Sequence, residues 1–494
     1  MATAQQLQIF SRAVSDQTRR FRFQTFLNTD LGKVYQVIPF DTLAKLFVPK
    51  KAKHPQGVKS IFTIQGGIGL QVLKHRYGMS NAQVIEMVNG NWQWQYFCGI
   101  ELSDFKPIGD KDIVGRWHRY LSYHDGGKTW VSFECTLANY WKETMNKVAP
   151  LSMKMDDATV FESYIKYPTD AGLIFDACQW VHSRIEELCK HAGIAKPRLE
   201  KYKNQIEKQL AFSKQRKKGI KKSRKRCKDL LYWLNKMLFD LQKLINTQQE
   251  VRNVINGIEK KHCEDFFERF RTAKAINAQQ QMKIDTPTLF KKIASEVIVS
   301  FYKPYLRAIV RGKTNKNVEF GAKAHISQVG GINFIEYLSF NAYHEGIRLP
   351  QSLAYHRKLM GQHCKQFAGD KLYANKKNRA LCKKRGIATC FAKQGNPNWK
   401  KKDLAIQQAE TTMRKELGKA RATRLEGSFG SAKNHHDLGK NKGRNAQSEI
   451  GWIYLSLLSA NASIIAQKKF GSTQKPPNQI QMELKRKNLG KIVA

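Results

Sequence analysis

The sequence predicts an α/β protein of the α+β kind, with several domains. At roughly 150 residues per domain, a chain of 494 residues has room for two to four of them. Apolar residues recur at helical spacing through most of the chain, whereas strand-like alternation occurs near 151–161 and 318–326. After residue 366, the order strand, helix, strand is typical of a βαβ unit.

Composition points to a polyanionic partner. The 86 Lys and Arg residues exceed the 40 Asp and Glu residues, which leaves a formal net charge of +46. Hydrophobic residues at 41% and aromatic residues at 11% exclude a disordered or collagen-like chain. So large a charge repels itself unless a partner neutralises it, and nucleic acid is the first candidate. A basic surface that only aids solubility is the alternative.

The cysteines and the apolar runs predict a cytoplasmic protein. Nine cysteines are scattered without any CxxC pair, which does not suggest a secreted disulfide framework. The first residues do not show a basic segment followed by an apolar one, as a signal peptide would. We find no run of about 18 apolar residues, so no membrane span is expected.

Residues 1–60 form an N-terminal segment that contains the basic run Pro49–His54, and residues 61–150 are predicted to form a helical domain. In that domain one helix should end near Gly78, and Ser80 with Gln83 forms a capping box for the next. This pair could be a DNA-reading helix-turn-helix or a plain αα-hairpin. The following aromatic residues are expected in the core: Trp92, Trp94, Tyr96 and Phe97.

Residues 151–175 are predicted to open a core of strands and helices, and residues 176–312 to form a helical, coiled-coil-like insertion in it. An apolar stripe at helical spacing is expected to be buried against a partner helix. It consists of Leu231, Leu234, Leu238, Leu241 and Ile245. The segment 214–228 holds ten basic residues. It is either a solvated loop or a grip on a phosphate backbone.

Residues 313–445 should complete the core, and residues 446–494 should form a C-terminal helix and a basic tail. Within the core, strands are predicted at 318–326, 366–370 and 387–392, and helices at 375–385, 403–418 and 423–434. The last helix is expected over 450–466.

Three acids occupy positions suited to metal binding. Asp157 lies in the first predicted core strand, Asp370 ends a later strand, and Glu426 lies on a helix. Mg²⁺ prefers oxygen ligands, and three convergent carboxylates can hold two such ions roughly 4 Å apart for phosphoryl transfer. The neighbouring Asp156 is a rival for Asp157, because adjacent strand residues face opposite sides and only one can line a site.

Basic residues surround these acids. Between Lys371 and Lys402 the chain has eleven basic residues and no acid. Glu426 and Lys433 are seven residues apart, so they share a helix face roughly 10 Å apart. This suits a metal site that meets a nucleic-acid backbone. A salt-bridged helix face is the alternative.

The motifs around the acids resemble those of bacterial insertion-sequence transposases with a DDE triad. Asp156-Asp-Ala-Thr159 looks like the block of the first Asp, and Gly369-Asp-Lys-Leu-Tyr373 like that of the second. Arg424-Leu-Glu-Gly-Ser-Phe-Gly430 with Lys433 is similar to the Glu block. Residues 67–121 resemble the helical domain that precedes such cores. We prefer Asp157 over Asp156, because the family's block has Asp, a small residue and Thr.

The resemblance implies an RNase H-like core that performs DNA transposition. Asp157, Asp370 and Glu426 would hold two Mg²⁺ ions, with Mn²⁺ as a substitute. A set of basic residues would contact DNA: Arg421, Arg424, Lys433, Lys371, Lys376, Lys377, Arg379 and Lys323. The implied partners are the element ends, target DNA and a second copy in a homodimeric synaptic complex. The implied location is the bacterial cytoplasm, associated with the nucleoid.

Other functions are kept as alternatives. A metal-dependent nuclease without strand transfer, or a non-catalytic basic scaffold for nucleic acid, would share the charge and some of the acids. Zinc-site spacing is not found, since His435-His436 and His262-Cys263 are only adjacent pairs. None of the 13 His residues has Arg three places on, which disfavours a tyrosine recombinase.

Overall fold

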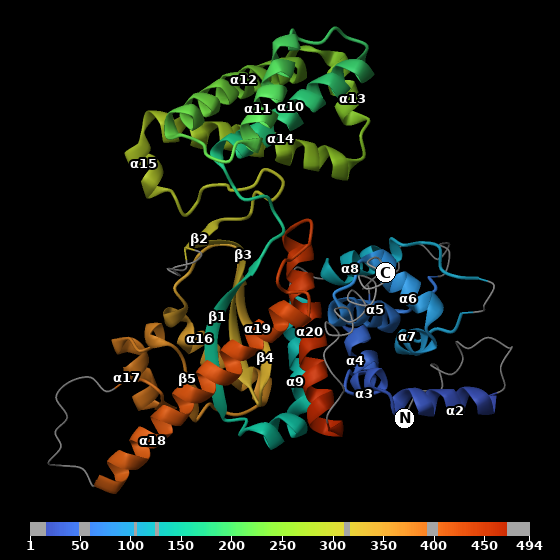
Figure 1. The fold of residues 1–494 in the computed structure, drawn as a ribbon, viewed down its shortest axis with the longest axis vertical. Coiled ribbons are helices and arrows are strands. Elements are labelled where there is room, and N and C mark those ends of the chain that lie inside the picture. Colours follow the sequence, from blue (N-terminus) through green and yellow to red (C-terminus); the bar gives the residue numbers. More distant parts are fainter. Residues whose placement is uncertain are drawn as a thin grey trace, which may run out of the picture. The chain divides into compact units, whose positions relative to one another are not determined.

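The computed structural model describes residues 16–48, 60–102, 106–123, 128–310, 317–392 and 404–471. The chain divides into two compact units. The core unit comprises Met1–Tyr164, Ala322–Ser339 and Tyr343–Ala494, and the helical unit comprises Ile165–Gly321 with Phe340–Ala342. Figure 1 shows the elements of each unit. The basic run 49–54, the residues 393–403 and the tail from 472 lie outside the described residues.

The N-terminal part of the core unit is helical. Three helices occur in the segment for which no element was predicted: α2 (Asp16–Leu27), α3 (Asp30–Gln36) and α4 (Phe40–Lys45). The helices α5 (Ile64–Tyr77) and α6 (Asn81–Gly90) follow, and then α7 (Trp92–Phe97), α8 (Ile113–Ser122) and α9 (Lys128–Val148). Burial of apolar faces around one common cluster holds these helices together.

The predicted end of α5 and the predicted cap of α6 are both present. Gly78 ends α5 with a positive φ of 61°, a conformation that costs glycine little. Ser80 and Gln83 form the predicted capping box. Of the four aromatic residues expected in the core, Trp94, Tyr96 and Phe97 are buried, whereas Trp92 is 41% exposed.

The sheet of the core unit combines parallel and antiparallel pairs. Its strands are β1 (Met153–Glu162), β3 (Val318–Val329), β4 (Ile332–Ser339), β5 (Gln366–Ala368) and β6 (Ala388–Thr389). The order is β4-β3-β1-β5-β6. The β3–β4 pair is antiparallel, and β5 runs parallel to both β1 and β6. With α17 (Lys376–Lys384) between β5 and β6, the predicted βαβ unit is present. The last strand is shorter than predicted.

Helices complete the core unit. After β4 come η2 (Glu345–Arg348) and α16 (Leu349–Met360), and after β5 comes η3 (Lys371–Tyr373). Towards the C-terminus, α18 (Leu404–Ala420) passes through the π-turn η5 (Arg421–Leu425) into α19 (Glu426–His435). The last helix, α20 (Ala446–Phe470), packs against α5, α8 and α9, and Tyr454 on it stacks on Trp130 at 4.7 Å.

The length and composition of α20 would allow it to cross a membrane, which the sequence analysis did not anticipate. In an apolar 18-residue window of this helix, 78% of the residues are buried within the protein. This burial is typical of a core helix in a water-soluble fold, where the surrounding protein provides the apolar environment.

The helical unit has its own core. It contains α10 (Asp170–Ala192), α11 (Glu200–Lys214), α12 (Ile220–Thr247), α13 (Gln249–Asn256), α14 (Lys260–Asp285) and α15 (Pro287–Lys292). The short strand β2 (Ala308–Val310) pairs with the first residues of β3. In the predicted stripe, Leu231, Leu234, Leu238 and Leu241 are buried, while Ile245 is partly buried against the same cluster. The stripe therefore packs as predicted, against α10 and α14.

Candidate active site

Two neighbouring parallel strands place Asp157 beside Asp370. Met155 on β1 is paired in register with Ala368, the last residue of β5. Asp157 and Asp370 each lie two residues beyond that pair. Because parallel strands run in the same direction, equal offsets bring the two acids side by side, Asp157 within β1 and Asp370 just after β5.

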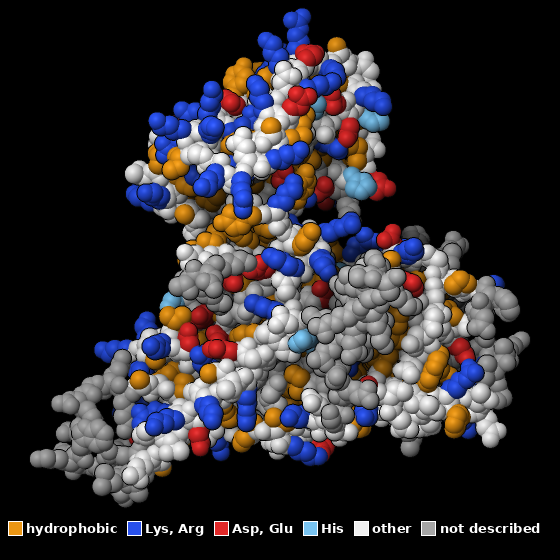
Figure 2. All heavy atoms as spheres, viewed as in Figure 1, with side chains coloured by type: hydrophobic (Ala, Val, Ile, Leu, Met, Phe, Trp, Pro, Cys, Tyr) orange, Lys and Arg blue, Asp and Glu red, His pale blue; other side chains and the backbone are white. Residues whose placement is uncertain are grey.

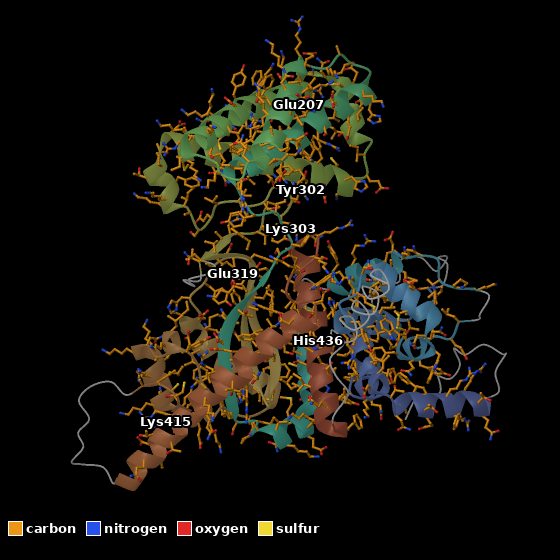
Figure 3. All side chains as sticks on the ribbon, viewed as in Figure 1. Glu207, Tyr302, Lys303, Glu319, Lys415 and His436 are labelled. Carbon is orange, nitrogen blue, oxygen red and sulfur yellow. The ribbon has the colours of Figure 1, made fainter. Side chains whose placement is uncertain are left out.

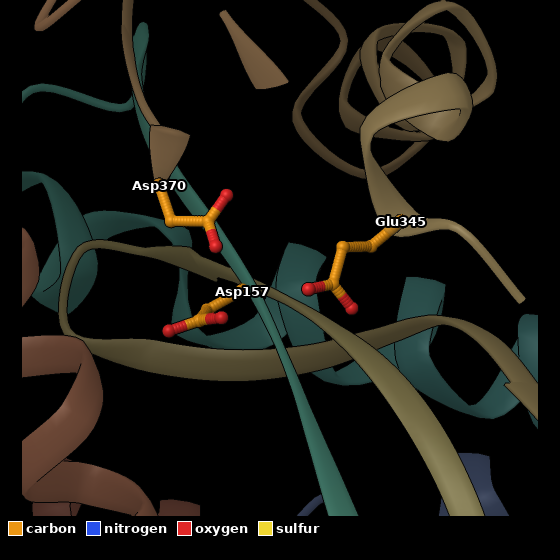
Figure 4. Close-up of side chains that lie close together, drawn as sticks. All are labelled: Asp157, Glu345 and Asp370. Carbon is orange, nitrogen blue, oxygen red and sulfur yellow. The ribbon is translucent and has the colours of Figure 1, made fainter. Parts of the chain in front are cut away.

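A third carboxylate joins them from η2. One carboxylate oxygen from each of Asp157, Glu345 and Asp370 lies within 4.8 Å of the other two. Figure 4 shows the three side chains pointing toward one another. The Glu345 residue is 8% exposed, and the two aspartates are partly buried. Glu345 was not among the acids predicted for this site.

A glycine allows η2 to approach η3 closely enough for this cluster to form. A Cβ atom on Gly346 would lie 2.2 Å from the carbonyl oxygen of Leu372, so a larger residue cannot occupy this position without a shift. The buried Asn378 joins the same two segments. Its Nδ2 donates to the carbonyl oxygens of Gly346 at 2.6 Å and of Tyr373 at 2.9 Å. Together these contacts hold Glu345 beside Asp370.

Two cations balance the cluster. Lys323 Nζ on β3 lies 2.7 Å from Glu345 Oε2 and donates to the carbonyl oxygen of Tyr343 at 2.8 Å. The guanidinium of Arg421 lies 2.8 Å from Asp157 Oδ2 and, through its other terminal nitrogen, 2.9 Å from Glu426 Oε1. Arg421 therefore links the first predicted catalytic acid to the third.

Burial and the neighbouring carboxylates raise the pKa of both aspartates. Burial raises the pKa of Asp157 to about 6; Arg421 opposes this shift, whereas Asp370 and Glu345 add to it. The pKa of Asp370 is raised mainly by burial, although its hydrogen bond from the Leu372 N–H opposes the change. A bound cation would relieve both effects.

The donor set suits a hard divalent cation. Three carboxylates converge, and such oxygens are the ligands that Mg²⁺ and Ca²⁺ take in proteins. Glu345 Oε2 is buried and receives no hydrogen bond from the described residues, although it lies in the ion pair with Lys323. The cluster can therefore hold a metal ion by both its geometry and its chemistry.

Comparison with known families identifies the kind of protein. Residues 367–462 match the family model described as a transposase DDE domain, and this span contains Asp370 and Glu426. Residues 19–119 match a second model, described as the transposase domain DUF772. These matches indicate an insertion-sequence transposase of the DDE type. A search of curated proteins and a search of solved structures each gave no match.

The fold places the two predicted aspartates together and the predicted glutamate beside them. Asp157 and Asp370 are both in the carboxylate cluster. Glu426, at the start of α19, has a side chain that is 51% exposed, and it is connected to the cluster through Arg421. The π-turn directly before it widens the helix there, and such turns are frequent at functional sites.

The rival Asp156 points to the other side of β1. It is fully buried and paired with the equally buried Lys154 at 3.0 Å. The hydroxyl groups of Ser327 and Ser352 donate to its two oxygens at 2.9 and 2.7 Å. A carboxylate so fully occupied has a structural role, which leaves Asp157 as the one that faces the cluster.

The predicted DNA-contacting residues differ in their accessibility. The exposed ones are Arg424, Lys371, Lys376 and Lys377. Arg379 is partly buried and donates to the carbonyl oxygen of Ala374, and Lys433 lies over the ring of Phe161. Lys323 and Arg421 are engaged with the carboxylates instead.

Glu345 has little signal in the sequence. It follows a strand in the segment Tyr343-His-Glu-Gly346 and belongs to none of the motif blocks. Gly346 is the one local hint, because a glycine directly after an acid permits a close approach of two backbones. The contact itself joins residues 25 positions apart in the chain, Glu345 and Asp370, and periodicity cannot reveal it.

Proposed function

We propose that this transposase binds the ends of its own element, cleaves DNA there in a Mg²⁺-dependent reaction and joins the cut end to target DNA. The observation that carries the proposal is the carboxylate cluster of Asp157, Glu345 and Asp370, within 4.8 Å of one another. It supports a catalytic site because it brings together two of the three acids expected from the family's motifs.

We further infer that the mixed sheet is the RNase H-like core of the family. This rests on the placement of Asp157 on the central strand β1 and of Asp370 directly after its parallel neighbour β5. Glu426 begins the helix that follows the π-turn, next to the cluster in space through Arg421. In this proposal the three motif blocks, far apart in the chain, lie together beside β1 and the end of β5.

The residues have distinct tasks in this proposal. The carboxylates of Asp157, Asp370 and Glu345, with Glu426, would hold Mg²⁺. The bound ion would supply Lewis-acid activation of an attacking oxygen and charge stabilisation of a leaving one. Lys323 holds Glu345 in place through its ion pair. The exposed Arg424 and the lysines of α17 bind DNA phosphates beside the site. Catalysis is then a matter of positioning and charge neutralisation.

Nicking of a labelled duplex that carries the element end tests this proposal. The substitutions Asp157→Asn, Asp370→Asn, Glu345→Gln and Glu426→Gln should each reduce Mg²⁺-dependent nicking by about two to three orders of magnitude. Duplex binding and thermal unfolding should change little. Glu416→Gln, an exposed acid on α18, serves as the matched control and should cleave normally.

Joining of the cut end to a target plasmid separates a transposase from a nuclease. Nicking without any joined product would contradict the strand-transfer part of the proposal. Full nicking by Asp157→Asn would contradict the metal site.

A further inference from the structure

The turn between α11 and α12 of the helical unit has an exceptionally high density of positive charge. No acid occurs between Glu207, labelled in Figure 3, and Asp229. Within the basic segment, residues 214–228, nine cations are exposed. They are Lys214, Arg216, Lys217, Lys218, Lys221, Lys222, Arg224, Lys225 and Lys228. Figure 2 shows many Lys and Arg side chains on the visible face of this unit.

Most of the basic segment is helix. Residues 215–219 form the connection, and α12 begins at Ile220. Lys221, Arg224, Lys225 and Lys228 follow a spacing of three, four and seven residues, so they share one helix face. From Lys221 to Lys228 this face is roughly 10 Å long, and along one strand of a duplex about three phosphates occupy that length.

One residue of the segment turns inward and fixes the turn. Arg226 is 6% exposed, and its guanidinium donates to the side chains of Gln209 at 2.9 Å and Gln205 at 2.7 Å. It also donates to the carbonyl oxygen of Gln205. These bonds tie the start of α12 to α11. The cationic face is therefore held on a rigid support.

This arrangement is unfavourable for the isolated unit. The cations repel one another, and the positive end of the helix dipole adds to the repulsion in the first turns of α12, which have no acid. None of the nine exposed cations forms an ion pair with another of the described residues. An external polyanion would relieve this repulsion.

We infer that the basic segment binds the phosphate backbone of duplex DNA, outside the carboxylate site. This inference rests on the proposed function. A lipid surface would need a continuous apolar helix face to insert. On α12 the leucines Leu230 and Leu234 are buried in the bundle, and the exposed apolar side chains, Ile220, Tyr232 and Phe239, lie far apart along the helix. A single strand would need a series of aromatic stacking platforms, whereas residues 214–228 contain no Phe, Tyr or Trp and the cationic face is followed by a single exposed ring, that of Tyr232.

The test measures binding of the full chain to a fluorescent random duplex without element ends, in EDTA and at several salt concentrations. In one variant Lys221, Arg224, Lys225 and Lys228 are changed to Gln. The matched control changes four exposed lysines elsewhere in the helical unit to Gln: Lys190, Lys243, Lys260 and Lys291. Both variants lose the same charge, so non-specific electrostatics cancel in the comparison.

The segment variant should bind at least tenfold more weakly, and its salt slope should shrink by up to about 3.6, or about 0.9 for each lost phosphate contact. The control should stay within about twofold of the wild type, and both variants should unfold at the wild-type temperature. Equal losses in the two variants, or no loss in the segment variant, would overturn the inference. The same binding measurement is made with single-stranded RNA and with vesicles of anionic lipid. If the segment variant loses affinity for one of these ligands but not for the duplex, the inference is also overturned. Because EDTA prevents cleavage, such a failure would leave the proposed cleavage activity untouched.

Discussion

Two adjacent carboxylates on β1 show how strongly local surroundings decide a side chain's role. Asp156 is buried with Lys154 and two serine hydroxyls, and each of its carboxylate oxygens accepts a hydrogen bond. Asp157 faces two further carboxylates and is partly exposed. The first arrangement stabilises only if all its partners remain. The cluster around Asp157 would be stabilised by a cation bound from solution.

Arg421 competes with a metal ion for Asp157. It occupies Asp157 Oδ2 at 2.8 Å, an oxygen that a bound cation would need. We expect Arg421→Ala to bind Mn²⁺ more tightly, by roughly five- to tenfold, since losing a partly buried ion pair of about 1 kcal/mol removes the competitor. Calorimetric titration of the full chain measures this. Arg424→Ala, in the same π-turn, is the control and should leave the affinity unchanged. Weaker Mn²⁺ binding by Arg421→Ala would mean that Arg421 organises the carboxylates instead.

Glu134 should make stability depend on pH. This acid on α9 is 5% exposed and accepts hydrogen bonds from the Ile335 N–H at 2.8 Å and from the Tyr355 hydroxyl. Burial raises its pKa from 4.5 to about 8, although both hydrogen bonds oppose the shift. Between these values the folded state keeps a proton that the unfolded state has lost, so this contribution to stability is complete below the unfolded pKa and falls as pH rises.

Glu134→Gln should remove that dependence, because glutamine is neutral at every pH. The free energy of unfolding of the wild type, minus that of the variant, should fall by up to about 4 kcal/mol between pH 5 and pH 8. Urea unfolding at several pH values measures the difference, and the other titrating groups cancel. A difference that stays constant with pH would show that Glu134 ionises normally in the folded protein.

At the scale of elements, the site depends on two short helical turns whose backbones are in direct contact, with no side chain between them. The turn η2 carries Glu345, and η3 follows Asp370. Their backbones meet at Gly346 and Leu372, and Asn378 at the start of α17 bonds to both. The sheet fixes Asp157 and Asp370, whereas this backbone contact fixes Glu345.

Gly346→Ala should therefore displace Glu345. The added Cβ would meet the Leu372 carbonyl oxygen at 2.2 Å, so the two turns must separate. We expect Mg²⁺ affinity and nicking each to fall by about tenfold, with about 1–3 kcal/mol of stability lost. Gly418→Ala on α18 is the control, because a Cβ there meets nothing within 4 Å. Unchanged metal affinity in Gly346→Ala would remove Glu345 from the metal site.

At the scale of the whole molecule, the charge of +46 should govern DNA affinity. If binding rests on phosphate contacts, the logarithm of the association constant falls linearly with the logarithm of the salt concentration. Six to ten contacts would weaken binding by about three to five orders of magnitude between 50 and 200 mM salt. Titration of the Asp157→Asn variant, which should bind without cleaving, measures the slope. A nearly flat response would contradict backbone binding as the role of this charge.

Local patterns in the sequence were enough to predict much of the fold. The turn at Gly78, the capping box at Ser80 and the leucine stripe of α12 depend on residues a few positions apart, so the sequence alone reveals them. The presence of strands at Asp157 and before Asp370 could also be predicted, although the strand after residue 366 is shorter than expected. Because β1 and β5 are parallel neighbours, the two acids come together.

Only the tertiary structure decided the rest of the site. Glu345 and Arg421 reach the cluster through contacts between distant segments, and no periodicity in the chain encodes such contacts. The separate core of the helical unit likewise depends on how its helices pack together. A local pattern determines which face of an element is apolar or charged. Which elements meet, and therefore which charges converge, is determined by the packing of the whole chain.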